Sequence, residues 1–230
     1  MRTHRFETDI RSIILDAAEK LVERYGYKKT TMEDIAREAG TGKGTLYLHF
    51  KNKEELAFSI LDRETAKVHA KLETIARSSD CPVNRVRAML LVRVMERFDS
   101  AQKYAQSLDD LLSTLRVELL QRRSQYIERE ARIIALAVED GIKDGSIKCQ
   151  DAYRTSQLLL MATSSLLPHN LSPKELGGRE EILSKTIQIV DLMFLGLLSE
   201  FQRKSYQSNT SADTIMTSYA MQNDMRTIEC

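Results

Sequence analysis

The sequence predicts an all-α protein in which a small N-terminal three-helix domain precedes a larger helical domain. Apolar residues recur at spacings of three and four over most of the chain, which is the period of an amphipathic helix. Only three prolines and nine glycines interrupt the 230 residues, so long helices are favoured over many short strands. We find no internal repeat and no convincing strand pattern.

Composition and charge restrict the class of protein. Hydrophobic residues make up 42% and charged residues 29%, as in a globular protein with a buried core. The net charge is only +1, so any surface that binds nucleic acid must be local. The three cysteines are scattered and lack metal-ligand spacing, which indicates a reduced, cytoplasmic protein without a metal. A secretion signal is absent and the apolar patches are too short to span a bilayer, so we expect no membrane partner.

The first helix is predicted over residues 7–25, where apolar residues share one face, and Gly26 ends it. A second, short helix follows. Thr30 or Thr31 can cap this helix, because a hydroxyl there accepts a hydrogen bond from a free backbone N–H group. Glu33 lies three residues after Thr30 and completes a capping box in that register.

The third helix is also short. Thr41 or Gly42 can cap it, and we expect it to extend to about His49. The fourth helix begins near Asn52, a good cap residue, and continues to Ile75. Acidic residues in its first turn suit the helix dipole.

Residues 78–82 are the first clear break in the helical pattern. Beyond it, helical patterns cover residues 83–98, 102–115, 116–140, 151–167 and 180–203. The patterns over 102–115 and 116–140 fit either one long helix or a kinked pair. The last two helices are notably apolar. Residues 205–230 are rich in Ser, Thr, Asn and Gln, and we expect them to form a weakly ordered tail.

No pattern of catalytic residues is evident, so we expect neither an enzyme nor a cofactor. The histidines His4, His49, His69 and His169 lie far apart, and no HExxH, GxSxG or Walker pattern occurs. Residues 40–45, GTGKGT, resemble a phosphate-binding loop only superficially. Their glycine spacing differs from a Walker loop, and a helix instead of a strand is expected before them.

Residues 30–53 fit two short helices joined by a tight turn. This is the layout of a helix-turn-helix motif, whose second helix enters the major groove of DNA. Residues 40–53 contain three lysines and no Asp or Glu, so the segment carries a net charge of +3. Charge alone favours a solvated surface over a DNA-binding one, so the residue types have to support the motif.

The residue types along the second of these helices suit contact with DNA. Gly44 allows a close approach of the backbone, and Lys43 can reach a guanine edge or a phosphate. Thr45 can bind a phosphate or touch a thymine methyl group. Tyr47 and His49 can donate hydrogen bonds to backbone oxygens at the rim of the groove.

Further phosphate contacts are predicted from Lys53, at the start of the fourth helix, and from Thr31, at the start of the second. The complete set of predicted DNA-contacting residues is Thr30, Thr31, Thr41, Gly42, Lys43, Gly44, Thr45, Tyr47, Leu48, His49 and Lys53.

Residues 10–56 resemble the DNA-binding domain of TetR-type transcriptional regulators, the tetracycline-repressor family. The matching residues are Ile14–Ala18, Gly26–Tyr27, Thr30–Thr31, Asp34–Ala36, Ala39–Gly40, Lys43–Tyr47, His49–Phe50 and Lys53–Leu56. The chain departs from the family pattern at two places. Thr41-Gly42 stands where Val-Ser is frequent, which removes a hydroxyl that can reach phosphate. Leu48 stands where an aromatic residue or His is common, which alters the base that is touched.

The resemblance implies a domain organisation and an assembly. Residues 1–53 would form the helix-turn-helix DNA-binding domain, and residues 54–204 an effector-binding and dimerisation domain. The helices near 151–167 and 180–203 would pair with their symmetry mates in a homodimer. The second of them is apolar on more than one face, which agrees with a dimer but also fits an intramolecular core. A symmetric dimer would read an inverted-repeat operator in double-stranded DNA.

The resemblance also implies a ligand-responsive repressor. A small-molecule effector, largely apolar, would bind in the helical domain, at residues that the sequence does not identify, and release the protein from its operator. Two alternatives stay open. One is an activator, or a regulator that needs no effector. The other is an all-helical enzyme or interaction module that retains a helix-turn-helix.

Overall fold

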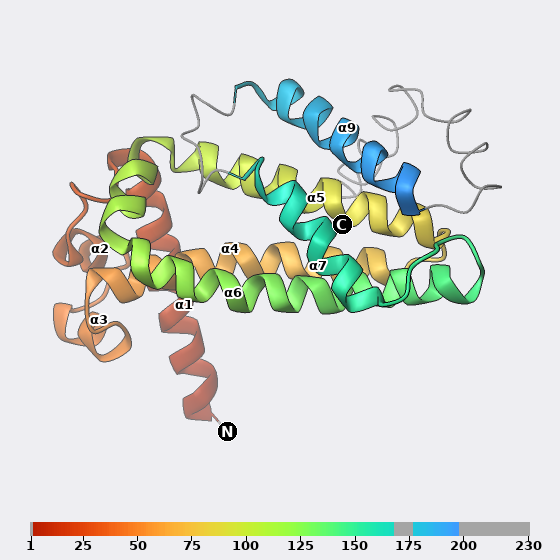
Figure 1. The fold of residues 1–230 in the computed structure, drawn as a ribbon. Coiled ribbons are helices and arrows are strands. Elements are labelled where there is room, and N and C mark those ends of the chain that lie inside the picture. The colour runs from red at the N-terminus through yellow and green to blue at the C-terminus, as the bar shows by residue number, and fades with distance from the viewer. Residues whose placement is uncertain (1, 168–176, 198–230) are drawn as a thin grey trace, which may run out of the picture.

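The computed structural model describes residues 2–167 and 177–197, and the fold is all-α as predicted. The helices are α1 (Arg2–Tyr25), α2 (Met32–Glu38), α3 (Lys43–His49), α4 (Lys53–Ala76), α5 (Pro82–Lys103), α6 (Ala105–Lys143), α7 (Ala152–Ser164) and α9 (Arg179–Leu197). The predicted tail, 205–230, and the end of the predicted helix 180–203 lie outside the described residues. Helices α1 to α3 sit at one end of an elongated body built around α4, α5 and α6 (Figure 1).

A core of apolar side chains holds the first three helices together. Ile14 of α1, Ile35 of α2 and Leu46 of α3 are all fully buried in it. The first turns of α4 complete this core with residues such as Leu56 and Phe58. Because α4 then continues into the body, one helix is shared by the two halves of the molecule.

The cap of α2 lies one residue later than the capping box predicted from Thr30 and Glu33. The Thr31 hydroxyl accepts a hydrogen bond from the Asp34 backbone N–H at 3.1 Å, and the Asp34 carboxylate accepts one from the Thr31 N–H at 3.1 Å. Thr30 is instead buried, and its hydroxyl donates to the Gly26 carbonyl at 2.9 Å. The box therefore forms with Asp34, since only Thr31 stands at the extended residue before the helix.

The patterns predicted over 102–115 and 116–140 form essentially one long helix. Helix α6 comprises 39 residues, and α5 extends to Lys103, further than the predicted end at residue 98. Tyr104 separates the two helices and packs in the N-terminal core. Helix α6 therefore runs from the N-terminal helices along the length of the body (Figure 1).

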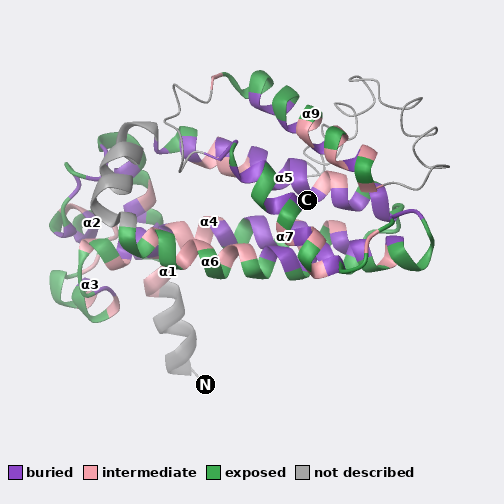
Figure 2. Ribbon diagram, in the orientation of Figure 1, coloured by how far each residue is buried: buried purple, intermediate pink, exposed green. Residues whose placement is uncertain are grey.

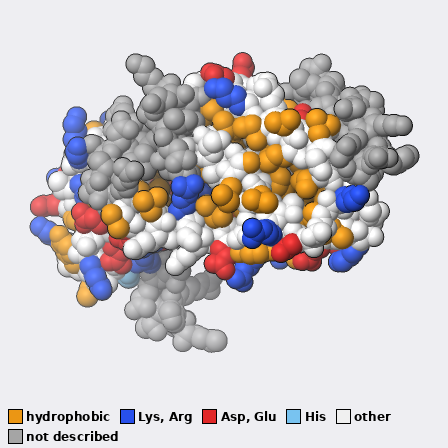
Figure 3. Space-filling view, viewed as in Figure 1, with side chains coloured by type: hydrophobic (Ala, Val, Ile, Leu, Met, Phe, Trp, Pro, Cys, Tyr) orange, Lys and Arg blue, Asp and Glu red, His pale blue; other side chains and the backbone are white. Residues whose placement is uncertain are grey.

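The core of the body lies where α4, α5, α6 and α7 meet, and α9 packs across α5 and α7 (Figure 2). On the inner face of α9, the side chains of Val190 and Phe194 are fully buried. Apolar side chains are exposed on the outer sides of α7 and α9: Leu158, Met161 and Leu192 are 57%, 66% and 73% exposed. Hydrophobic side chains gather in this region of the surface (Figure 3).

Candidate DNA-binding surface

The turn between α2 and α3 is built from backbone geometry. Gly40 adopts a φ of +64°, a left-handed conformation that glycine adopts without steric cost. The Thr41 N–H then donates to the Ala36 carbonyl at 2.9 Å, which folds the chain back against α2. Gly42 is extended and begins α3 without a side-chain cap. The two helices are thus joined as the helix-turn-helix layout requires.

Helix α3 presents one face to the core and another to solvent. Leu46 and Phe50 are fully buried, and they attach α3 to α1, α2 and α4. On the outer side, Tyr47 is 43% and Leu48 86% exposed. The Lys43 ammonium lies 3.7 Å from the Glu33 carboxylate, and both side chains are largely exposed. Such a surface ion pair is weak, so the Lys43 ammonium can leave the Glu33 carboxylate and bind a phosphate or a base instead.

The structure sorts the predicted residues by their accessibility. Exposed are Thr31, Gly42, Lys43, Gly44, Tyr47 and Leu48; half-buried are Thr41, Thr45, His49 and Lys53; buried is Thr30. All of the exposed and half-buried residues belong to α2, α3, the turn between them or the start of α4. This end of the molecule therefore forms one continuous candidate surface.

Thr30 does not fit the role predicted for it, and Lys53 has contacts within the protein. Thr30 is only 2% exposed, so its side chain is not available for a phosphate. The Lys53 ammonium donates to the Thr30 carbonyl at 3.0 Å and lies 4.2 Å from the centre of the Tyr27 ring. Burial lowers the pKa of Lys53, which agrees with an amine engaged inside the protein. Lys53 thus holds the turn that carries Thr31.

Arg11 positions α3 and was not identified from the sequence. Its guanidinium donates to the His49 carbonyl at 2.7 Å and to the Ser59 hydroxyl at 3.1 Å. It also stacks over the Phe50 ring at 4.1 Å from the ring centre. Arg11 therefore fastens the end of α3 to α1 and α4. The sequence feature that could have identified Arg11 is its place three positions before Ile14, where a charged residue borders the buried face of α1.

Replacing Arg11 with alanine should destabilise the protein by about 1–2 kcal/mol, because two charge-assisted or polar hydrogen bonds and a stacking contact disappear. Denaturant unfolding followed by circular dichroism measures this change. The matched control is Arg24→Ala, which removes an exposed arginine from the same helix. Equal stabilities of the Arg11→Ala variant and the parent would show that Arg11 does not hold α3.

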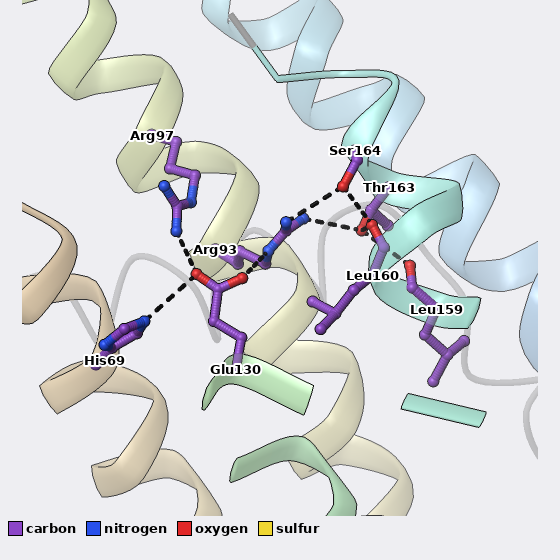
Figure 4. A network of polar contacts seen from close by, with 8 residues as sticks. All are labelled: His69, Arg93, Arg97, Glu130, Leu159, Leu160, Thr163 and Ser164. Carbon is purple, nitrogen blue, oxygen red and sulfur yellow. Dashed lines mark hydrogen bonds and ion pairs between the residues drawn. The ribbon is translucent and has the colours of Figure 1, made fainter. Parts of the chain in front are cut away.

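A buried ionic network lies in the body, away from this surface (Figure 4). Glu130 of α6 is fully buried and accepts a hydrogen bond from Arg93 Nε of α5 at 2.6 Å and another from Arg97. His69 Nε2 of α4 lies 3.7 Å from the same carboxylate. Arg93 also donates to Thr163 and to the neighbouring serine on α7, so the network joins four helices.

Helix α4 is also tied to α6 close to the N-terminal helices. The Asp62 carboxylate accepts a hydrogen bond from Arg122 at 2.6 Å and another from the Tyr126 hydroxyl. The next residue of α4, Arg63, binds Asp16 and, at 3.3 Å, Glu19 of α1. These pairs couple the body to the helix-turn-helix through adjacent residues of α4.

The fold and this surface define a helix-turn-helix DNA-binding regulator. Residues 14–60 match the sequence model of the family described as "Bacterial regulatory proteins, tetR family". The chain is 31% identical over 160 residues to the "Uncharacterized HTH-type transcriptional regulator YhgD" of Bacillus subtilis, and the match covers 69% of this chain and 83% of that protein. The chain belongs to the TetR family of bacterial transcriptional regulators.

Solved structures share the fold at lower sequence identity. A transcriptional regulator from Cytophaga hutchinsonii is 20% identical with a TM-score of 0.69, and the match covers 82% of this chain and 98% of that one. SmeT, the repressor of a multidrug efflux pump of Stenotrophomonas maltophilia, has been solved in complex with triclosan. That complex is 22% identical with a TM-score of 0.62, covering 84% of this chain and 93% of that one. Among the residues that our structure describes, no helix has the length and hydropathy to cross a membrane.

Proposed function

We propose that the protein is a homodimeric repressor that binds an inverted-repeat operator and leaves it when a small-molecule effector binds. The observation that carries the proposal is the exposed face of α3, on a helix held rigidly by Leu46, Phe50 and Arg11. A rigid, solvent-facing second helix is what a helix-turn-helix needs in order to enter the major groove.

The proposed DNA contacts are the predicted residues that the fold leaves accessible: Thr31, Thr41, Gly42, Lys43, Gly44, Thr45, Tyr47, Leu48 and His49. Thr30 and Lys53 support this surface from inside. We also propose to divide the chain within α4, after residue 60 instead of residue 53, because the first turns of α4 pack in the N-terminal core.

The proposed dimer uses the outer faces of α7 and α9. Leu158, Met161 and Leu192 expose apolar side chains there, and exposed apolar surface that is contiguous marks interaction sites. Pairing these faces about a two-fold axis would set two copies of α3 side by side, so that they read two half-sites of an inverted repeat.

The proposed effector is a largely apolar small molecule that binds in the body. A structure that shares the fold, SmeT, has been solved as a complex with a small molecule, triclosan. Because α4 passes from the body into the helix-turn-helix, a movement of α4 against α6 would change the distance between the two α3 helices. An effector that binds the second arrangement more tightly would shift the population away from the operator-binding state.

Binding of the full-length protein to DNA upstream of its own gene tests the proposed surface. Tyr47→Ala should weaken binding to most sequences alike, by about tenfold, because a backbone contact carries no sequence information. Lys43→Ala should also reduce the preference for the operator over random duplex, since a lysine at the groove can touch a guanine edge. Lys143→Ala, at the far end of α6, is the control. If both variants bind DNA like the parent, Tyr47 and Lys43 do not contact DNA. Reporter expression with and without the gene would distinguish repression from activation.

A further inference from the structure

The outermost line of α3 carries a single side chain. Successive residues of a helix are about 100° apart, so residues two positions before and after a given residue lie on nearly the opposite side. Leu46 is fully buried, and its counterparts on the opposite side are Gly44 and Leu48. Thr45 and Tyr47 lie on the two flanks. Because Gly44 has no side chain, Leu48 is the one side chain of α3 on the side opposite Leu46, and it is 86% exposed.

Gly44 lies on the same side of α3 as Leu48 and has no side chain, so nothing besides Leu48 projects from that side. A Cβ atom placed on Gly44 would have no neighbour within 4 Å, so the glycine is not required by packing inside the protein. Its absence of a side chain allows the backbone of α3 to approach the floor of a groove closely. Leu48, one turn further along the helix, would then be pressed against the edges of the bases.

The leucine side chain at position 48 restricts which groups on the base edges it can contact favourably. Its side chain neither donates nor accepts a hydrogen bond, so it would leave most base-edge groups without the partner that water provides. The thymine C5-methyl group is the apolar feature of the major groove. An 86% exposed leucine gains favourable free energy when it is covered by such a group.

We propose that Leu48 determines sequence preference by van der Waals contact with the methyl group of one thymine in each half-site of the operator. The inference rests on the proposed function, since it assumes that α3 enters the major groove. It goes further by naming the base and the chemical group that this position recognises. Thr45 also carries a methyl group, but it is half-buried on the flank of α3.

The test is the effect of removing single methyl groups from the DNA. Duplexes that bind the full-length protein are first selected from a random pool. Each thymine of the preferred duplex is then replaced by deoxyuridine, which lacks only the methyl group. A replacement in one half-site should weaken binding by about fourfold, and replacements in both half-sites by about sixteenfold, as expected for one buried methyl group in each half-site.

Variants of the protein identify the residue that makes the contact. Leu48→Ala should bind the thymine and deoxyuridine duplexes equally at that position, whereas Leu136→Ala, which shortens a 54% exposed leucine of α6, should discriminate as the parent does. A Leu48→Ala variant that still discriminates, or a preferred duplex insensitive to every deoxyuridine, would overturn this inference alone. Failure to select any preferred duplex would overturn the proposed function and the inference with it.

Discussion

A Glu130→Gln variant should lose about 3 kcal/mol of folding stability, because it leaves buried positive charge without its counter-ion. Arg93 is 1% exposed and Glu130 is fully buried, so water cannot replace the lost carboxylate. Denaturant unfolding of the parent and the variant measures the difference. Because glutamine has nearly the same shape as glutamate, this substitution changes the charge at position 130 with little change in packing.

The matched control is Glu128→Gln, two positions earlier on α6. Glu128 pairs with Arg132 at the surface, where both side chains are at least half exposed. Its replacement should leave the stability nearly unchanged, since exposed ion pairs contribute little. Adding Arg93→Met to Glu130→Gln should recover part of the loss, because the uncompensated guanidinium is then removed. Equal effects of the two glutamine substitutions would contradict this account of the network.

The pKa of Glu130 predicts how this difference depends on pH. Burial alone would raise the pKa, but the guanidinium groups of Arg97 and Arg93 outweigh it and hold the pKa well below the ordinary value of 4.5. A carboxyl group whose pKa is depressed by folding stabilises the protein above its unfolded pKa and loses this contribution as the pH falls. The stability difference between the parent and Glu130→Gln should therefore shrink as the pH decreases below 4.5.

A Leu192→Glu variant should be monomeric and should bind an inverted-repeat operator about a hundredfold more weakly, because the second half-site no longer benefits from linkage to the first. Leu192 is 73% exposed on the outer face of α9, so a glutamate there should not disturb the fold of the single chain. In a dimer interface the same carboxylates would be buried near one another without a partner.

Sedimentation or light scattering checks the assembly against a chain mass of 26.3 kDa. Leu136→Glu is the control, because Leu136 is a comparably exposed leucine, at 54%, on α6 instead of on α7 or α9. The control should remain a dimer with the parent's affinity. A monomeric parent protein, or a dimeric Leu192→Glu variant with full affinity, would contradict the proposed interface.

Much of the fold was predictable because it depends on local patterns. The apolar period identified the helices, and Gly26 and Asn52 indicated where the first ends and the fourth begins. The register of the α2 cap was wrong by one residue, since Thr30 and Thr31 each have an acidic residue three positions later. Only the conformation at Thr31 distinguishes them, and it depends on the turn that precedes α2.

The candidate surface was predictable to a similar extent. The residues along α3 followed from the helix-turn-helix pattern, because they are consecutive in the sequence. The roles of Arg11 and Lys53 did not, because their partners lie on other elements, at the His49 and Thr30 carbonyls. The same applies to Glu130, whose partners come from two other helices, α4 and α5. Periodicity predicts which face is buried but not which distant group completes a buried charge.

The most direct test of the account is a titration of the purified full-length protein with its upstream DNA and with random duplex, over a series of salt concentrations. The account predicts preferential binding to the upstream DNA. The logarithm of the binding constant should fall linearly with the logarithm of the salt concentration, because phosphate contacts release counter-ions. Binding that is independent of salt, or equal affinity for upstream and random DNA, would contradict the assignment of a sequence-specific operator to the exposed face of α3.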